Sequence, residues 1–345
     1  MIRLSAGFRA SWRVTAVACV GALLLAGCTN SVPIVGVTGL PSIGISVPLH
    51  TVACTTTGSC VALGTTGSDQ APSSVGEYRE SDATWSSLVV PSAPSSVITT
   101  ASCWSTGCLI GGVQPSGNLL WGYNASSQSI SVLRAPSGGQ GVRALSCFGV
   151  AACAAIVSTG VNSSSLLSYT DNGGATWSTK VPLDWSLGET VADLACTDPV
   201  DCMATAVTSS NTLDVEVTHD AGLTWAVRST PSAWLTLSSL NCRTLRCVGL
   251  ATTSTKSLIV RTSTFGRRWS TIALPAKANA IACSTYRHCV VAGERNSDSP
   301  WLATLDNGVL HVAVLKYVPT PLVDVACGAK VCATVGVTTV LALRP

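Results

Sequence analysis

The sequence predicts an all-β fold, and more narrowly a seven-bladed β-propeller. Seven short cysteine pairs recur with first members 49, 44, 49, 46, 41 and 44 residues apart, a period typical of four-stranded propeller blades. The composition is 47% apolar but only 11% charged, and its Ser, Thr, Val, Ala and Gly residues favour strands and turns. No stretch after residue 28 has helical apolar periodicity over three turns.

Each cysteine pair sits between an apolar residue and a Val/Ala/Leu-rich run, which is the pattern of a hairpin between the first two strands, A and B, of a blade. Residues facing each other across a hairpin lie about 4.5 to 5.5 Å apart, within disulfide range. We therefore predict one disulfide in the A–B hairpin of each blade. The predicted pairs are Cys54–Cys60, Cys103–Cys108, Cys147–Cys153, Cys196–Cys202, Cys242–Cys247, Cys283–Cys289 and Cys327–Cys332.

Zinc ligation is the alternative interpretation of the cysteine pairs. Zinc sites usually space their ligands by two to four residues, whereas four or five separate the cysteines here, and the chain has only 4 His. The sequence therefore predicts neither a metal nor a cofactor.

The N-terminus predicts export and lipidation. Residues 1–27 have a basic start and an apolar run, and the sequence Leu25-Ala26-Gly27-Cys28 resembles the lipobox of bacterial lipoproteins. The resemblance implies that Cys28 becomes the lipidated first residue of the mature chain and that residues 28–41 form a tether. We then expect the protein on the extracytoplasmic side of the cell membrane, where disulfides persist. A plain secretory cleavage or an uncleaved anchor is the alternative.

The propeller is predicted over residues 42–345, with blades starting near residues 50, 97, 142, 191, 237, 278 and 322. The chain stops thirteen residues after Cys332, so blade 7 lacks an outer strand. Ile43–Pro48 precedes Cys54 much as Tyr317–Pro319 precedes Cys327. We expect this N-terminal segment to complete blade 7 and close the ring.

A second repeated pattern marks a turn late in the blades. Its best copy is Thr218-His219-Asp220-Ala221-Gly222-Leu223-Thr224-Trp225, and a second runs from Thr170 to Trp177 with Asn172 at the acid position. The segment around Asp306 is a partial copy, and Glu80 and Thr264 replace the acid in degenerate ones.

This pattern resembles the Asp-box, or BNR repeat, of sialidase-like propellers and of photosystem II assembly factor-like propellers, and the cysteine frame resembles actinobacterial members. The resemblance implies that Asn172, Asp220 and Asp306 staple turns and that Trp177 and Trp225 cover them. It assigns none of them a catalytic role.

Charge excludes one class of partner. The formal net charge is +3, with 20 Lys and Arg against 17 Asp and Glu. Removing Arg3, Arg9 and Arg13 with the signal peptide leaves 17 of each sign. A nucleic-acid-binding protein needs a clear basic excess, so none is predicted.

Two surfaces are binding candidates. Trp185 and Trp234 follow the outer strands of adjacent blades and could stack a sugar or grip a peptide, with Asp184 and Glu189 nearby; packing between blades is the alternative. The opposite face gathers Arg243, Arg246, Arg267 and Arg268, continued by Arg287, His288 and Lys330. That basic surface could face an acidic partner or anionic lipid headgroups, or be merely solvated.

Asp193 and Asp324 are weaker candidates. Both lie three residues before a first cysteine and are expected on innermost strands near the central channel. Two carboxylates from separate blades make a poor cation site.

The sequence favours a non-catalytic binding or assembly module for a protein or glycan partner. The alternative is a glycoside hydrolase of sialidase type, which needs three arginines, a Tyr nucleophile with a Glu, and an acid–base Asp. The R-x-P at Arg134-Ala135-Pro136 lacks the context of the family signature, and no Tyr–Glu pair falls on suitable loops. Neither a G-x-S-x-G motif nor a phosphate-binding loop occurs.

Overall fold

The computed structural model describes most of the chain from residue 48 onward. The described ranges are 48–64, 75–79, 84–91, 96–159, 165–178, 181–183, 190–208, 210–295, 299–315, 320–336 and 339–343. All regular secondary structure in them is β-strand, which confirms the all-β prediction.

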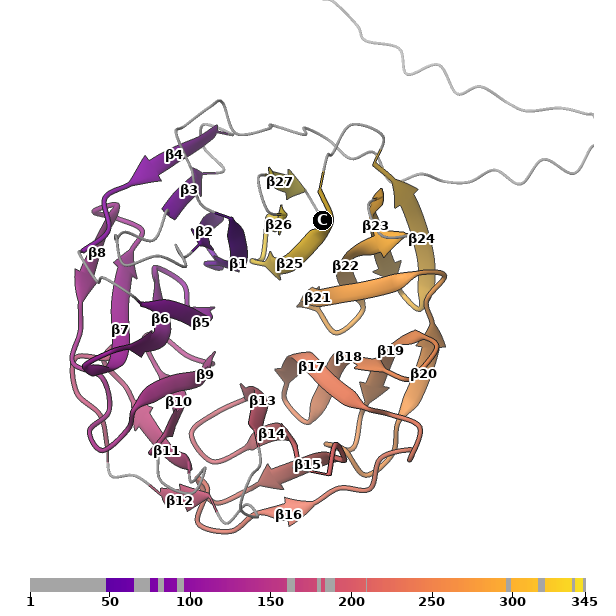
Figure 1. Ribbon diagram of the computed structural model, residues 1–345, viewed down its shortest axis with the longest axis horizontal. Helices are drawn as coiled ribbons and strands as arrows, with labels where there is room; N and C mark the ends of the chain where they lie inside the picture. Colours follow the sequence, from indigo (N-terminus) through magenta and orange to yellow (C-terminus); the bar gives the residue numbers. More distant parts are fainter. Residues whose placement is uncertain are drawn as a thin grey trace, which may run out of the picture. The chain divides into compact units, whose positions relative to one another are not determined.

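Seven antiparallel sheets stand around a central channel, so the fold is a seven-bladed β-propeller, as predicted (Figure 1). Each of blades 1 to 6 is a four-stranded meander that runs from an innermost strand A to an outer strand D, and three strands of blade 7 are described. From blade 1 to blade 7 the strands are β1 (Leu49–Cys54), β2 (Ser59–Gly64), β3 (Val75–Arg79), β4 (Thr84–Leu88); β5 (Val97–Cys103), β6 (Gly107–Gln114), β7 (Gly117–Asn124), β8 (Ser129–Val132); β9 (Gly141–Cys147), β10 (Cys153–Ser158), β11 (Ser165–Thr170), β12 (Val181–Leu183); β13 (Thr190–Cys196), β14 (Cys202–Val207), β15 (Leu213–Thr218), β16 (Ala226–Val227); β17 (Thr236–Arg243), β18 (Arg246–Thr252), β19 (Ser257–Thr262), β20 (Ser270–Ala273); β21 (Lys277–Thr285), β22 (His288–Arg295), β23 (Ser299–Asp306), β24 (Val309–Val314); β25 (Leu322–Cys327), β26 (Cys332–Gly336) and β27 (Thr339–Leu343).

All seven predicted disulfides are present, each between directly opposed residues of an A–B hairpin. Their Cα atoms are 3.9 to 4.1 Å apart. The second cysteine of each pair is buried, whereas the first lines the central channel. The seven bridges therefore form a ring around the channel wall.

Apolar packing joins neighbouring blades. A separate cluster of buried residues lies at each of the seven seams between described blades. The seam between blades 7 and 1 is among them, with Leu49 and Val52 packed in the same cluster as Val335 and Val340. The first and last described blades therefore contact each other directly.

A glycine at or near the end of strand B in four blades is explained by a close backbone approach. A Cβ on Gly64, Gly112, Gly293 or Gly336 would lie 2.4, 2.2, 2.2 or 2.6 Å from a carbonyl oxygen at the start of strand A. Such distances are far inside van der Waals contact, so no other residue fits without moving backbone. The glycine of the repeated cysteine frame is thus a packing requirement.

The closing strand predicted at Ile43–Pro48 lies outside the described residues, except for Pro48. Pro48 is exposed and directly precedes β1. Its carbonyl oxygen is the atom that approaches Gly64 of β2. Pro48 therefore lies beside the inner strands of blade 1; the rest of the predicted closing segment, residues 43–47, lies outside the described residues.

We predict that Gly293→Ala destabilises the protein by about 1–3 kcal/mol, because the new methyl group forces strands A and B of blade 6 apart. Thermal unfolding followed by circular dichroism measures the change. Gly149→Ala is the control, since its nearest neighbour is the Ala152 side chain at 3.2 Å from the new Cβ. Equal melting temperatures for the two variants would contradict the explanation.

Candidate functional site: the central channel and the turn face

The channel is a cavity of about 930 Å³ lined by all seven A strands. Each A strand has a register irregularity. In six blades it falls at the residue four positions before the first cysteine, whereas in blade 5 it falls at Ser239 and Leu240. Bulges of this kind re-aim side chains, and residues from every bulge line the cavity. Among them are His50, Thr99, Arg143 and Asn279. The channel wall is therefore polar at this level.

Side chains of the A strands hydrogen-bond across the seams. In three seams the residue before the first cysteine of one blade accepts the backbone N–H of the first cysteine of the next. These bonds run from Cys147 to Ser102 Oγ (2.9 Å), from Cys196 to Ser146 Oγ (2.8 Å) and from Cys283 to Asn241 Oδ1 (3.1 Å). In blade 6 the donor lies nearer the start of strand A, and Asn279 Nδ2 donates to Leu322 O (2.8 Å). In the seam between blades 1 and 2 the bond lies in the A–B turns instead of the A strands, and Thr57 Oγ1 donates to Ser105 O (2.7 Å).

Asp193 and Asp324 make the two remaining seam bonds. In their blades an alanine precedes the first cysteine, and its side chain cannot accept a hydrogen bond. The aspartate carboxylate accepts the backbone N–H of the next blade instead. Leu240 N donates to Asp193 Oδ2 (2.6 Å), and Val52 N donates to Asp324 Oδ2 (2.9 Å). Each carboxylate also accepts the N–H of the residue that follows it, at 2.8 Å. Neither makes an ion pair with a cation in the described ranges.

Burial raises the pKa of Asp193 to about 6 and that of Asp324 to about 7, although their backbone hydrogen bonds act in the opposite direction. The charge of Asp193 contributes further to the raised pKa of Asp324. The two carboxylates therefore interact through the channel. The sequence placed both residues at the channel but gave no sign of their role in the seams.

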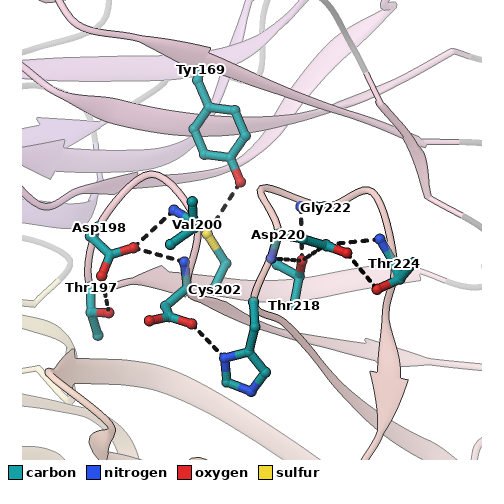
Figure 2. Close-up of polar contacts among 11 residues, drawn as sticks. Tyr169, Thr197, Asp198, Val200, Cys202, Thr218, Asp220, Gly222 and Thr224 are labelled. Carbon is teal, nitrogen blue, oxygen red and sulfur yellow. Dashed lines mark hydrogen bonds and ion pairs between the residues drawn. The ribbon is translucent and has the colours of Figure 1, made fainter.

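The blade 4 Asp-box forms the staple that the resemblance implies (Figure 2). Asp220 Oδ1 accepts the Thr218 hydroxyl (2.8 Å) and the Thr224 N–H (2.9 Å), and Oδ2 accepts the Thr224 hydroxyl (2.6 Å). These hydrogen bonds lower the pKa of the Asp220 carboxyl. Gly222 lies at φ 83°, a conformation that suits glycine. Asp220 therefore holds a turn together.

Asn172 makes the same staple in blade 3, where its Oδ1 accepts the Thr170 hydroxyl and the Thr176 N–H, both at 2.9 Å. In the degenerate blade 5 copy the Thr264 hydroxyl accepts the Arg268 N–H at 3.0 Å. A hydroxyl thus replaces the carboxylate there.

The interpretation of Asp306 as an Asp-box acid is wrong. Asp306 pairs with Val309 across a two-residue turn, in which Asn307 and Gly308 have φ values of 49° and 93°. Such an Asn-Gly turn reverses the chain too early for a box. The Asp306 carboxylate instead contacts His288 Nδ1 at 2.9 Å.

The tryptophans pack into seams. Trp177 and Trp225 contact the clusters between their own blades and the preceding ones, and Trp177 Nε1 donates to Arg134 O at 3.1 Å. Trp234 is only 4% exposed and meets Trp269 edge-on, with ring centroids 5.5 Å apart. The prediction that Trp234 offers its ring to a ligand is therefore wrong. Trp185 lies outside the described residues, as do Asp184 and Glu189.

We call the face formed by the A–B and C–D turns the turn face. In blades 3 to 6 the C–D turn donates a backbone N–H to the A–B turn. The bonds are Gly173 N to Ala151 O (2.8 Å), Ala221 N to Val200 O (3.1 Å), Phe265 N to Leu245 O (3.1 Å) and Asn307 N to Arg287 O (3.0 Å). The two sets of turns therefore form one continuous surface.

Figure 2 shows how the two turns of blade 4 lie beside each other. Asp198 Oδ1 accepts the N–H groups of Val200 and Asp201, both at 2.8 Å. Tyr169 reaches from blade 3 to Cys202 Sγ at 3.5 Å, and burial, then Asp198 and Asp220, raise the pKa of its hydroxyl. This side of the turn face is acidic.

The turn face of blades 5 and 6 carries the predicted arginines. Arg243, Arg246, Arg267 and Arg268 are all exposed, as is Arg287 of blade 6. None of the five makes an ion pair with a carboxylate in the described part of the chain. The Tyr286 ring lies between Arg246 and Arg261, whose Cζ atoms are 5.6 and 4.5 Å from its centroid.

Sequence reasoning missed the apolar residues on this surface. Val150, Val200 and Leu245 stand at the A–B turns of three consecutive blades and are 81%, 44% and 44% exposed. Leu223, in the C–D turn of blade 4, is 73% exposed. An apolar residue in a turn was the available signal, but only the packed turns show that these four lie on one face.

The described residues contain one close Tyr–Glu pair, the groups a sialidase would need. Tyr123 donates its hydroxyl to Glu77 Oε1 at 2.7 Å, but both residues are only 1% exposed, within the seam between blades 1 and 2. A sugar cannot reach them there. Within the same ranges, no group of three His, Cys, Asp or Glu side chains could hold a metal ion, and no helix is suited to cross a membrane.

Comparison with known proteins finds the fold but no family. No family model matches the chain, and no curated protein matches it. A solved YCF48 bound to a D1 peptide is 14% identical, with 89% of this chain and 93% of that chain covered and a TM-score of 0.61. YCF48 from Cyanidioschyzon merolae is 13% identical, with 87% and 96% covered and a TM-score of 0.59.

An enzyme has a similar fold. The GH74 enzyme of Niastella koreensis is 8% identical, with 86% of this chain and 53% of that chain covered and a TM-score of 0.61. At these identities the likeness shows a β-propeller and no more.

We predict that the protein becomes more stable as pH falls from 8 to 5, by on the order of 4 kcal/mol. Asp193 and Asp324 have folded-state pKa values above the ordinary 3.8, so between pH 4 and 7 the folded state binds more protons than the unfolded state. Its stability is therefore lost as pH rises through the two folded pKa values. Melting temperatures at several pH values measure this.

The double variant Asp193→Asn/Asp324→Asn should flatten this pH dependence, since Asn241 already makes an equivalent seam bond with an amide. The exposed Asp171→Asn is the control and should keep the full pH dependence. An unchanged slope in the double variant would show that other groups are responsible.

Proposed function

We propose that this protein is a non-catalytic binding or assembly module, lipid-anchored outside the cytoplasm, whose turn face holds a protein segment with acidic and apolar side chains. The observation that carries the proposal is the combination on one face of five exposed arginines without a carboxylate partner in the described ranges and four exposed apolar turn residues.

Electrostatics favour an acidic partner. Arg228 lies beside the cluster, and burial, followed by the positive charge of Arg267, lowers the pKa of its guanidinium. Positive charges are therefore close together around Arg228 and Arg267. A carboxylate of a bound partner would reduce the repulsion between them. Arg243 and Arg246 flank Leu245, so one bound segment could meet both a charge and an apolar contact.

Apolar exposure favours a protein over a glycan. Val150 and Leu223 are among the most exposed large apolar residues of the described chain, and such residues gathered on one face mark protein interaction sites. A glycan site would instead need accessible aromatic rings, and Trp234 is buried.

The fold is compatible with this function. One propeller of similar fold is a YCF48 that was solved bound to a D1 peptide. From that protein we take only the kind of partner, a peptide segment. Neither the identity of its partner nor its contacting residues enter the proposal.

Anchoring at the cell membrane is the second part of the proposal. It is supported by Leu25-Ala26-Gly27-Cys28 after an apolar run and by seven disulfides, which fit an oxidising compartment. A diacyl anchor of this type binds membranes stably. Replacement of Cys28 by Ser should release the protein from the membrane fraction.

The turn face is tested by photo-crosslinking in the anchored, full-length protein. A photoreactive residue at Leu245 should crosslink to a protein partner, whereas the same residue at Val132, which is 65% exposed on β8, should not. Arg267→Glu/Arg268→Glu should reduce the Leu245 crosslink at least tenfold, because reversal of two charges repels an acidic segment.

Lysine replacements at the same two positions are the matched control and should retain the crosslink. Equal crosslinking by the Glu and Lys variants would contradict a charge-based site. Sedimentation of the soluble Cys28→Ser protein with vesicles containing phosphatidylglycerol tests the lipid alternative; binding there that the Glu variant loses would replace the protein partner by headgroups.

A panel of fluorogenic glycosides that includes a sialoside tests the absence of catalysis. We expect no turnover above that of heat-denatured protein. Any turnover that persists through purification would favour the glycoside hydrolase alternative.

A further inference from the structure

Arg228 occupies a position that holds an aliphatic residue in the other five blades with a described fourth strand. In each blade the second cysteine faces one residue of strand C, and the position lies on or directly after strand D, opposite the residue three before it. In blade 4, Cys202 faces Thr218, and the N–H of Arg228 donates to Val215 O at 2.7 Å. The equivalent residues are Leu88, Leu133, Val181, Ile272 and Ala313.

The aliphatic residues at this position pack against the next blade. Leu88, Leu133 and Ile272 belong to the apolar clusters of the seams between blades 1 and 2, 2 and 3, and 5 and 6. Arg228 lies in the corresponding seam between blades 4 and 5, because a Cβ on Gly266 of blade 5 would be 3.0 Å from Arg228 Cγ. The stem of Arg228 therefore takes the place of an aliphatic side chain and brings a guanidinium into the seam.

The guanidinium of Arg228 lacks the partners that a half-buried cation needs. Its Nε atom is buried without a hydrogen-bond partner in the described part of the chain, and no carboxylate of these ranges forms an ion pair with it. Arg267 directly follows Gly266, and burial, followed by the charge of Arg267, lowers the pKa of Arg228. A leucine would avoid both penalties, so arginine at this position is unfavourable for the fold alone.

The C–D turn of blade 5 reverses the charge of the corresponding turn in blade 4. In blade 4, Asp220 accepts the hydroxyl of Thr224 at 2.6 Å. In blade 5 a hydroxyl stands at the acid position, where Thr264 accepts the N–H of Arg268 at 3.0 Å. The turn of blade 5 therefore carries Arg267 and Arg268 without a carboxylate of its own.

The carboxylates of the blade 4 turns are already engaged. Asp220 holds its own turn, and Asp198 accepts two backbone N–H groups of the A–B turn. Asp201 contacts His219. None of the three is therefore left to balance Arg228 and Arg267.

We propose that the seam between blades 4 and 5 is an oxoanion-binding site in which Arg228 and Arg267 hold one carboxylate. A guanidinium can donate two parallel N–H groups to a planar carboxylate. A carboxylate beside both arginines replaces their repulsion by two attractive contacts, and it supplies an acceptor to a guanidinium that has none in the described ranges. Arg228 is then the residue that selects an acidic group.

The source of the carboxylate rests on the proposed function, in which a protein segment binds the turn face. Phe265, which directly precedes Gly266, donates its N–H to Leu245 O at 3.1 Å. The oxoanion site therefore lies beside the exposed Leu245. A segment that occupies both places has an Asp or Glu close to an apolar side chain.

Arg228→Leu in the anchored, full-length protein tests the site, because it introduces the residue that blades 1 and 2 have at this position. We expect the melting temperature to rise by roughly 1–4 °C and the photo-crosslink from Leu245 to fall at least tenfold. A loss of binding together with a gain in stability cannot come from misfolding. Arg134→Leu, an exposed arginine of blade 2, is the matched control and should change neither quantity. An unchanged crosslink or a lower melting temperature for Arg228→Leu would overturn the proposal.

Inorganic phosphate probes the same site without a partner. Melting temperatures of the full-length protein are compared in phosphate and in chloride at equal ionic strength. Phosphate stabilises proteins in general because it is excluded from their surfaces, so every variant should gain. The unsubstituted protein should gain about 2 °C more than Arg228→Leu, because it also binds the anion. Arg228→Lys keeps the charge without the fork of N–H groups and should gain an intermediate amount. Equal gains in the three proteins would overturn the site.

The two measurements separate the site from the proposed function. A phosphate gain that requires Arg228, with no protein crosslinked at Leu245, would support the oxoanion site and reject the protein partner. A crosslink that persists in Arg228→Leu, together with equal phosphate gains, would reject the site and leave the proposed function standing.

Discussion

Closure of the ring at the seven innermost strands is the constraint on which the rest of this structure depends. Each blade contributes one A strand to the channel wall, and six of the seven seams are joined there by an A-strand side chain that bonds the backbone of the next blade. The seam between blades 1 and 2 is joined at the A–B turns, where Thr57 Oγ1 donates to Ser105 O. Apolar clusters fill the seams outside this polar ring. The disulfides brace the A–B hairpin of each blade beside these bonds, so the hairpins reach the turn face in fixed positions.

The seam bonds do not need charge, since Ser102, Ser146 and Asn241 make them with neutral groups. Asp193 and Asp324 make equivalent bonds with carboxylates that burial disfavours in their charged form. This unfavourable energy of ionisation applies as pH rises through the two raised pKa values, about 6 for Asp193 and about 7 for Asp324. The channel is thus the part of the protein whose stability responds most directly to acidity.

The repeated turn pattern around Asp220 and Asn172 serves structure in this protein. The side-chain oxygens of Asp220 and Asn172 accept hydrogen bonds from residues of their own turns. Trp225 and Trp177, which follow these turns, pack against the preceding blade. What the turn face offers outward are Leu223 and Leu245 with the arginines between blades 5 and 6. The side chains that the turn face presents to solvent therefore lie beside the turn staples and take no part in them.

The sequence by itself determined the number of blades, the disulfide pairing and the position of the arginines, because each follows from local spacing along a repeated unit. Only the tertiary structure decided the surroundings of residues that stand at similar positions in the repeat. Asp306 matches the acid of the repeated turn pattern in sequence, but it precedes a two-residue Asn-Gly turn. The position of Trp234 in the sequence suggests an exposed ring, but residues of the next blade cover it. The seam partners of Asp193 and Asp324 lie 47 and 272 residues away in the chain. Such contacts exist only once the ring has closed, so no local pattern encodes them.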